Sequence, residues 1–413
     1  MRHPILPPDT PAAVALAIRL SLRDPGPKDE AALRLLEDQA GRRAFHDWAM
    51  NQGVLGLALN SLRQLGWLEG VDPAAAEKIL APLKILRQQA RLWDLERDRV
   101  LALLGRLNIA PVVLKGGALR EVAYQDPVER PVGDLDLLVE KGEMPRALQA
   151  LTGGGYTAPD PEMIRRFETD HFHLPLTNRG GFEVELHWGL GQPSAPWQLD
   201  PAGMLARAVS VPSTRGEMRV PTVEDMVVHL CSQNTEDDFS KLRRLVDIDR
   251  VTAVQPPDWD RIVSLSRAGG LEIIVGLSLQ LAHRLLGTPL RAGMLQDLVP
   301  SRLTRLHLSL LQPEAGLLAG TGQAMDAGSK ALSLWLTAPR HRMRHLRNIL
   351  RREEQMGLHP GSGPGHKWLS GMGMAIRLAA FHGLLWARGL LRMVGDSRQA
   401  TPRLWDECPG TES

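Results

Sequence analysis

The sequence predicts an α+β protein, in which a small mixed sheet is flanked by N-terminal and C-terminal helical regions. Two short apolar runs predict the first strands: residues 109–114, which end at a glycine pair, and residues 134–139, which carry two aspartates. A hairpin is predicted over residues 171–188, because the Asn-Arg-Gly-Gly turn at 178–181 contains residues that tolerate positive φ. On both sides of these segments, apolar residues recur at three- and four-residue spacing, which is typical of helices.

The residues before the sheet predict a helical region. Residues 12–18 begin it with an almost continuously apolar run, and residues 31–36 continue it with apolar residues at helical spacing. Between residues 81 and 107, leucines alternate with Arg, Gln and Asp at helical period, and Asn108 is the expected stop. The helical region is therefore expected to lead directly into the first strand.

The first strand is expected to be short and to end at the Gly116-Gly117 pair. Regular pairing is predicted to begin at Val112, because Pro111 has no N–H group to donate to a ladder. A short helix is expected after the glycines, at residues 118–124, and Asp126-Pro127 ends it.

Helices dominate the rest of the chain. The second strand, residues 135–139, is followed by a predicted helix at residues 145–151 that starts with proline. After the hairpin, Thr222 is expected to cap a helix whose first turn carries Glu224 and Asp225, which complement the helix dipole. Further helices are predicted at residues 242–251, 259–268, 271–286 and, with a more basic composition, within 300–395.

Two aspartates in the second strand are the first candidate site residues. Successive side chains of a strand point to opposite faces, so Asp134 and Asp136 share one face. Two carboxylates fixed side by side repel each other unless a cation lies between them. Hard divalent cations such as Mg²⁺ prefer carboxylate oxygens together with substrate phosphates. The pair therefore predicts a metal-nucleotide site.

The second hairpin strand supplies a third acid. Residues 182–188 alternate between apolar side chains on one face and Glu183, Glu185 and His187 on the other. Glu185 is the expected site residue, whereas Glu183 is expected to be a solvated neighbour. His187 has three interpretations: it orients Glu185, it contacts the nucleotide, or it only caps the strand.

Composition and charge limit the class of protein. The 413 residues carry 49 Lys and Arg against 47 Asp and Glu, a net charge of +2 that gives no strong signal for nucleic-acid binding. Two cysteines, Cys231 and Cys408, build no disulfide framework, which suits a reducing cytoplasm. The first residues lack the apolar core of a signal peptide, and no run approaches a transmembrane helix. We expect a soluble, cytoplasmic protein.

Three motifs together resemble a known family. They are Leu114-Lys115-Gly116, then Arg130-Pro131-Val132-Gly133-Asp134-Leu135-Asp136, then Glu185-Leu186-His187-Trp188. At these residues the chain resembles the minimal nucleotidyltransferases of the polymerase-β-like superfamily, and most closely the uncharacterised bacterial nucleotidyltransferase-family proteins. The resemblance covers roughly residues 95–255. It implies a polymerase-β-like nucleotidyltransferase domain.

The patterns along the chain and the resemblance together give an expected organisation of the chain. The expected parts are an N-terminal helical region (1–94), the nucleotidyltransferase catalytic domain (95–220), a helical domain (221–298), a C-terminal basic helical region (299–395) and a disordered tail (396–413).

The implied activity is the transfer of a nucleoside monophosphate from a nucleoside triphosphate to an acceptor hydroxyl. Asp134 and Asp136 would hold Mg²⁺ (or Mn²⁺), and Glu185 would complete the triad as a ligand or as a base. ATP is the expected nucleotide, and the acceptor is a small molecule, a peptide or a protein. The expected nucleotide-binding residues are Lys115, Gly116, Gly117, Arg130 and His187. Among them, Lys115 and Arg130 would neutralise phosphate, and the glycines would let the backbone approach it.

Two other functions compete with this one. A non-catalytic nucleotide-binding or antitoxin-like regulatory module would keep the fold, although the intact triad argues against it. Glycosyl transfer from a sugar nucleotide also uses an Asp-x-Asp pair, but no multi-strand nucleotide-sugar domain precedes it here, so we rank it last.

Several polar segments have two interpretations. Asp170, His171 and His173 form either a metal cluster or only the alternation of a hairpin, which we favour. The charged residues at 243–250 (Arg243, Arg244, Asp247, Asp249 and Arg250) are expected to form a solvated helix face with i,i+4 pairs, with a helix that contacts the base or the acceptor as the alternative. A solvated helix is also favoured over a nucleic-acid or membrane contact for the basic stretch 340–352. Residues 378–394 are expected to pack on the core, with peripheral membrane contact as the alternative.

Overall fold

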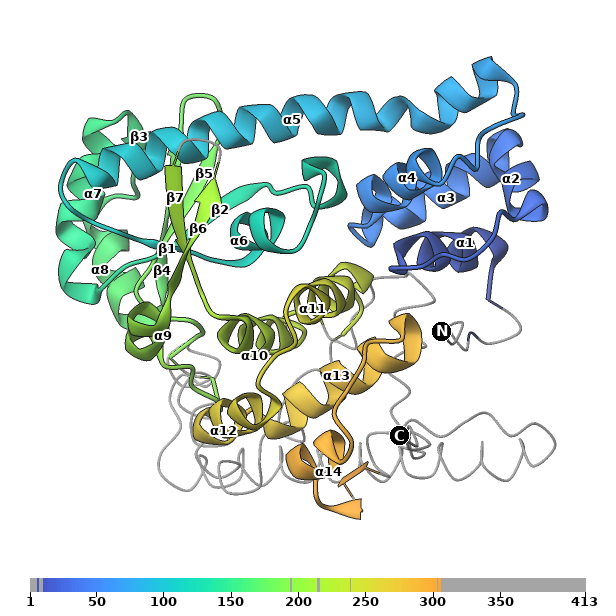
Figure 1. Cartoon of the computed structure of the whole chain (residues 1–413). Coiled ribbons are helices and arrows are strands. Elements are labelled where there is room, and N and C mark those ends of the chain that lie inside the picture. Colours follow the sequence, from blue (N-terminus) through green and yellow to red (C-terminus); the bar gives the residue numbers. More distant parts are fainter. Residues whose placement is uncertain are drawn as a thin grey trace, which may run out of the picture.

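A mixed sheet lies toward one end of the molecule, at the left of Figure 1. The computed structural model describes residues 6, 10–193, 195–213, 216–237, 239–302 and 304–305. In this part of the chain the sheet has seven strands in the order β3-β4-β5-β2-β1-β7-β6. The strands are β1 (Val112–Val113), β2 (Asp134–Leu138), β3 (Tyr156–Thr157), β4 (His173–Asn178), β5 (Glu183–His187), β6 (Val209–Ser213) and β7 (Gly216–Val220). The predicted α+β class with a mixed sheet is confirmed.

The expected strands lie next to one another in the sheet. β2 pairs antiparallel with β1 and parallel with β5, and β5 pairs antiparallel with β4 across the predicted turn. In that turn Asn178 accepts hydrogen bonds from the N–H groups of Gly180 and Phe182, and Gly181 has a φ of +79°. The β6–β7 hairpin and the short strand β3 were not predicted, so the sheet is larger than expected.

Helices come before the sheet in the chain, between its strands and after it (Figure 1). Before the sheet come α1 (Ala12–Ser21), α2 (Glu30–Glu37), α3 (Gln39–Asn51), α4 (Leu55–Gln64) and α5 (Pro73–Gly105). Between the strands lie α6 (Lys115–Val122), α7 (Met144–Gly153), α8 (Pro161–Asp170) and α9 (Pro201–Arg207), with 3-10 turns η1 (Pro127–Glu129) and η2 (Lys141–Glu143). After the sheet follow α10 (Val223–Gln233), α11 (Leu242–Val254), α12 (Trp259–Gly269), α13 (Glu272–Leu286) and α14 (Met294–Leu298).

The long helix α5 connects the N-terminal helices with the sheet. It has 33 residues, which corresponds to a length of ~50 Å. It begins earlier than the apolar periodicity predicted, because Asp72 caps it by accepting a hydrogen bond from the Ala75 N–H and Pro73 suits its first position. The expected boundary between residues 94 and 95 falls inside this continuous helix.

The helix after β1 begins at Lys115 and not after the glycine pair, so the expected start at residue 118 was wrong. Gly116 and Gly117 are buried in its first turn and do not separate the helix from the strand. A Cβ atom on Gly117 would lie 2.8 Å from Val113 Cγ1 and 3.2 Å from Trp93 Cη2. The glycine therefore allows close packing of α6 against β1 and α5.

The helices after the sheet agree with the predictions, with one correction. Thr222 caps α10 by accepting a hydrogen bond from the Asp225 N–H. The predicted solvated face of α11 was wrong, because Asp247 and Asp249 are each only 1% exposed. Asp249 accepts hydrogen bonds from Arg23 Nε at 3.0 Å and Thr288 Oγ1 at 2.8 Å. The spacing of charged residues along α11 could not show that its charged face also packs against other segments of the chain.

The two faces of the sheet pack against different cores. A large core includes Leu135 and Leu137 of β2 and continues through the N-terminal and C-terminal helices. A smaller core on the opposite face contains Val112, Leu114, Leu138, Leu190 and Met204. Asp134 and Asp136 share this second face with Leu138, because side chains alternate along β2. The acids therefore lie where the sheet is less thickly covered by apolar side chains.

Three expectations lie outside the described residues: the basic stretch 340–352, the apolar segment 378–394 and the tail 396–413. Within the described residues, no helix combines the length and the apolar character that crossing a membrane requires.

A first prediction concerns the contact between α4 and η1. A Cβ atom on Gly56 would lie 1.8 Å from the carbonyl oxygen of Val128, so Gly56→Ala should separate the two elements. We expect a loss of about 1–3 kcal/mol in the free energy of unfolding, measured by urea denaturation. Gly105→Ala is the matched control, because nothing lies within 4 Å of its Cβ position near the end of α5. Equal stability of the two variants would contradict the packing.

A second prediction concerns Cys231 in α10. The side chain is fully buried, and burial raises the pKa of its thiol to about 12. Since the thiolate is the reactive form, iodoacetamide at pH 8 should leave Cys231 unmodified in the folded protein and alkylate it after unfolding. Peptide mapping by mass spectrometry distinguishes Cys231 from Cys408. Alkylation of Cys231 at the same rate in both states would show that the thiol is accessible.

Candidate active site

Three carboxylates from two neighbouring strands meet at one place. Asp134 and Asp136 lie on β2, and the parallel register sets Asp136 directly beside Glu185 of β5. One ligand oxygen from each of the three side chains lies within 4.8 Å of the others. The acids that the sequence singled out therefore converge, and Glu183, which pairs with Asp134, is exposed as expected.

Lys115 supplies the positive charge between two of these acids. Its Nζ donates hydrogen bonds to Asp136 Oδ1 and, at 3.3 Å, to Glu185 Oε2. Burial disfavours the ammonium, but the charges of Asp136 and Glu185 outweigh this and raise the pKa of Lys115. Lys115 has a φ of +48°, an uncommon conformation for a residue with a side chain. The backbone at the start of α6 thus aims the ammonium at the acids.

His187 is the second group that bonds to both acids. Its Nε2 lies 3.0 Å from Asp136 Oδ1 and 3.1 Å from Glu185 Oε2, and its side chain is 1% exposed. Burial opposes the imidazolium, but the hydrogen bonds to the two carboxylates raise the pKa of His187. The contact with Glu185 is the one that the first of the three interpretations of His187, orientation of Glu185, requires.

The three acids differ in their electrostatic surroundings. Burial opposes ionisation of Asp136, but the charge of Lys115 and the hydrogen bond from His187 hold its pKa well below the ordinary value. The pKa of Asp134 is raised, first by burial and then by the charge of Asp136. Asp134 therefore has the least compensated carboxylate of the three. An oxygen-only donor set with this imbalance fits a hard divalent cation.

Arg130 lies beside the site, but its hydrogen bonds go to residues outside the three acids. Its Nε donates to Asp247 Oδ1 at 2.8 Å, and its Nη1 donates to the Pro131 carbonyl oxygen at 2.9 Å. Tyr124 donates to the same Asp247 oxygen at 2.7 Å. Arg130 is only 7% exposed, so it links the loop before β2 to α11. Its Nη1 is also 3.2 Å from where a Cβ on Gly116 would lie.

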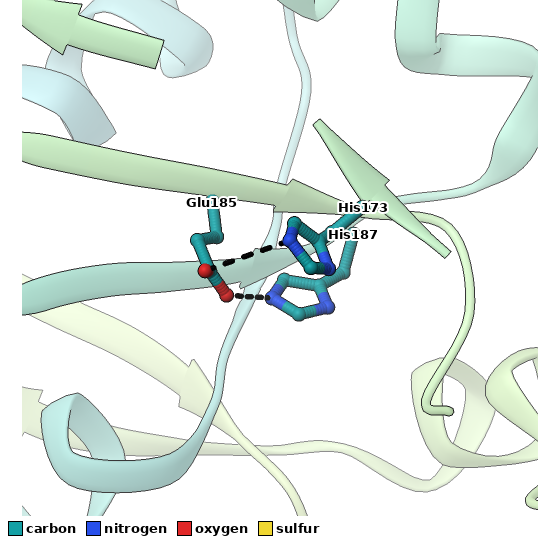
Figure 2. A group of neighbouring side chains, drawn as sticks. All are labelled: His173, Glu185 and His187. Carbon is teal, nitrogen blue, oxygen red and sulfur yellow. Dashed lines mark hydrogen bonds and ion pairs between the residues drawn. The ribbon is translucent and has the colours of Figure 1, made fainter. Parts of the chain in front are cut away.

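His173 is a neighbour that the sequence analysis did not assign to the site. The β4–β5 register places it opposite His187, and its Nε2 lies 3.6 Å from Glu185 Oε1 (Figure 2). Burial lowers its pKa to about 4. Pairing the residues of the two strands one by one, outward from the Asn178–Gly181 turn, would have placed His173 opposite His187. His171 instead packs on Phe167, with ring centroids 4.5 Å apart.

A further histidine, His229 of α10, was also missed. It is 5% exposed, and burial, together with the charges of Lys115 and His187, lowers its pKa to about 3. In the sequence it appears only as one polar residue in an apolar helix. Burial thus favours the neutral imidazole at this position.

Comparison with known proteins identifies one relationship. A family model described as "Uncharacterised nucleotidyltransferase" matches residues 38–287, which include the acids, Lys115 and the helices that pack around them. No curated protein matches the chain.

A third prediction concerns the buried pair Arg130–Asp247. Arg130→Met would leave Asp247 buried with its charge and only Tyr124 as a donor among these contacts. We expect a loss of about 3–5 kcal/mol in the free energy of unfolding, measured by urea denaturation. The double variant Arg130→Met/Asp247→Asn should recover part of it, because the unpaired charge is gone.

The control for this prediction is Arg43→Met. Arg43 belongs to an ion pair whose partners are 82% and 71% exposed, so its loss should leave the urea midpoint almost unchanged. If Arg130→Met behaves like this surface variant, the buried pair does not anchor the loop.

Proposed function

The chain belongs to the uncharacterised nucleotidyltransferase family, and from this premise we propose that it is a Mg²⁺-dependent enzyme that transfers a nucleoside monophosphate from a nucleoside triphosphate, with ATP expected, to an acceptor hydroxyl. The acceptor class is a small molecule, a peptide or a protein. The observation that carries the proposal is the convergence of three carboxylate ligand oxygens within 4.8 Å on two adjacent strands.

The donor set supports a divalent cation at this place. Asp134, Asp136 and Glu185 offer only oxygen ligands, which Mg²⁺ prefers and Mn²⁺ accepts. When bound, such a cation would stabilise the entering and leaving oxygens of an in-line displacement at phosphorus. In this proposal Asp134 and Asp136 hold the cation, and Glu185 acts as a further ligand or as a base.

The start of α6 supports binding of the triphosphate next to the acids. Leu114, the residue before this helix, offers no side-chain hydrogen bond to it, so the first backbone N–H groups of the helix have no capping side chain. Such a helix end favours phosphate, and Gly116 and Gly117 are two of its first three residues. Lys115 lies at the same end, and in this proposal its ammonium, which bonds to Asp136, would also neutralise phosphate charge there.

Arg130 has a positioning role in this proposal. Its guanidinium is bonded to Asp247, so it would act on the nucleotide only through Gly116 and the loop before β2. His187 likewise would hold the carboxylates of Asp136 and Glu185 in place.

The reaction would proceed as follows. The acceptor oxygen forms a bond to the α-phosphorus of the nucleotide, and the bond from this phosphorus to the pyrophosphate oxygen breaks. The hydroxyl proton goes to a base, for which Glu185 is the candidate because its carboxylate is 18% exposed whereas that of Asp136 is 2% exposed.

A fourth prediction tests the acids. The Asp134→Asn/Asp136→Asn variant should lose the Mg²⁺-dependent part of nucleotide affinity, measured by calorimetry with and without Mg²⁺. It should also lose more than about 100-fold in transfer of label from α-labelled ATP to acceptors in cell extract, because even indirect contacts to a metal are worth 10- to 100-fold. Unchanged Mg²⁺-dependent affinity would remove the triad as the metal site.

The matched control is Glu183→Gln. Glu183 lies on the same face of β5 as Glu185, but it is exposed and lies outside the group of converging oxygens. This variant should bind and transfer like the wild type. Nucleotide binding without any labelling of extract would favour a non-catalytic module.

A further inference from the structure

A second cluster of potential metal ligands adjoins the three acids on the side of β4. One ligand atom from each of His173, Glu185 and His187 lies within 4.8 Å of the others (Figure 2). The three side chains come from directly paired strands, because His173 lies opposite His187 in the β4–β5 register. The cluster is therefore fixed by the sheet and not by a loop.

The two oxygens of Glu185 face different neighbours. Oε2 lies 3.1 Å from His187 Nε2 and 3.3 Å from Lys115 Nζ, whereas Oε1 lies 3.6 Å from His173 Nε2. Figure 2 shows both imidazole rings with one nitrogen turned toward this carboxylate. Glu185 thus belongs to an oxygen-only group on one side and to a nitrogen-containing group on the other.

The orientation of the two rings is a separate observation. The Nδ1 atoms of His173 and His187 are buried and have no hydrogen-bond partner among the described residues. Both rings are thus aligned by the contacts of Nε2 with Glu185 and, for His187, with Asp136. Two imidazoles and one carboxylate that converge in this way form a donor set of two nitrogens and one carboxylate oxygen.

The spacing of this donor set matches a known coordination chemistry. A tetrahedral zinc ion with bonds of about 2.0–2.2 Å holds its ligand atoms about 3.3 Å apart. The two nitrogen–oxygen distances in the cluster are of this size: 3.1 Å from His187 Nε2 to Glu185 Oε2 and 3.6 Å from His173 Nε2 to Glu185 Oε1. Imidazole nitrogen favours first-row transition metals over Mg²⁺. Two histidines and one carboxylate also leave the fourth tetrahedral position open for water or substrate.

We propose that His173, Glu185 and His187 form a binding site for a divalent transition-metal ion of the Zn²⁺ class, adjacent to the acid triad and sharing Glu185 with it. The site is distinct from the proposed Mg²⁺ site because it excludes Asp134 and requires His173. It does not depend on nucleotide transfer, so it is tested without nucleotide.

The test uses the full-length, metal-stripped protein. Zn²⁺ binding is measured by calorimetry, and Co²⁺ binding by its visible absorption, which reports the ligand set. His173→Gln should weaken both ions by at least about tenfold and change the Co²⁺ spectrum. His171→Gln is the matched control, because its ring is 6.3 Å from that of His173 and lies outside the cluster.

Asp134→Asn separates this site from the triad. It should leave Zn²⁺ and Co²⁺ affinity within about threefold of the wild type, since Asp134 is not one of the three ligands. Failure of the proposed nucleotidyl transfer would not affect this result. Wild-type affinity in His173→Gln, or an equal loss in Asp134→Asn, would overturn the proposal, as would the absence of Zn²⁺ binding by the wild type.

A measurement on the wild type covers the case in which His173→Gln does not fold. Zn²⁺ should protect His173 from modification by diethylpyrocarbonate, as mapped by mass spectrometry, and Mg²⁺ at the same concentration should not. His173 is 19% exposed, so it is accessible to the reagent in the free protein. Equal modification with and without Zn²⁺ would overturn the site.

Discussion

The mutual repulsion of Asp134, Asp136 and Glu185 is the constraint on which the rest of the structure depends. The parallel pairing of β2 with β5 holds these carboxylates together, and in a buried place that arrangement requires positive charge. Lys115 supplies it by bonding to Asp136 and Glu185, and the hydrogen bonds of His187 to the same two carboxylates raise the pKa of its imidazole. The strained φ of +48° at Lys115 is understandable in this setting, because the ion pairs it allows compensate for the unfavourable backbone conformation.

The strand that carries the aspartates is fixed from both helical regions. On one side, Trp93 of α5 donates a hydrogen bond from Nε1 to the Asp134 carbonyl oxygen at 3.2 Å. On the other side, Arg130 ties the loop before β2 to Asp247 of α11. Both helices that make these contacts, α5 and α11, lie within the residues that the family model matches, 38–287. The helices before and after the sheet are part of the framework that positions the acids.

Local patterns in the sequence were sufficient for most elements near the site. The alternation in β5 and the Asn178–Gly181 turn predicted the hairpin, and the Asp-x-Asp spacing predicted the shared face. What could not be predicted depends on contacts between distant segments. Gly116 and Gly117 were expected to separate the strand from the helix. The reason for a glycine inside the helix, the close packing of Gly117 against Val113 and Trp93, involves a residue distant in the sequence and could not be predicted from the local pattern. In the same way, the burial of Asp247 depends on Arg130, which lies 117 residues away.

The order of strands sorts the ligand atoms by chemical type across the site. β2 presents only carboxylates, β5 presents a carboxylate and an imidazole, and β4 presents an imidazole. Adjacent strands lie ~4.8 Å apart. The type of ligand available to a cation therefore changes from oxygen to nitrogen over the short distance from β2 to β4. Glu185 is the one side chain that belongs to both groups. Its position between β2 and β4, and not its acidity alone, is therefore what connects the two halves of the site.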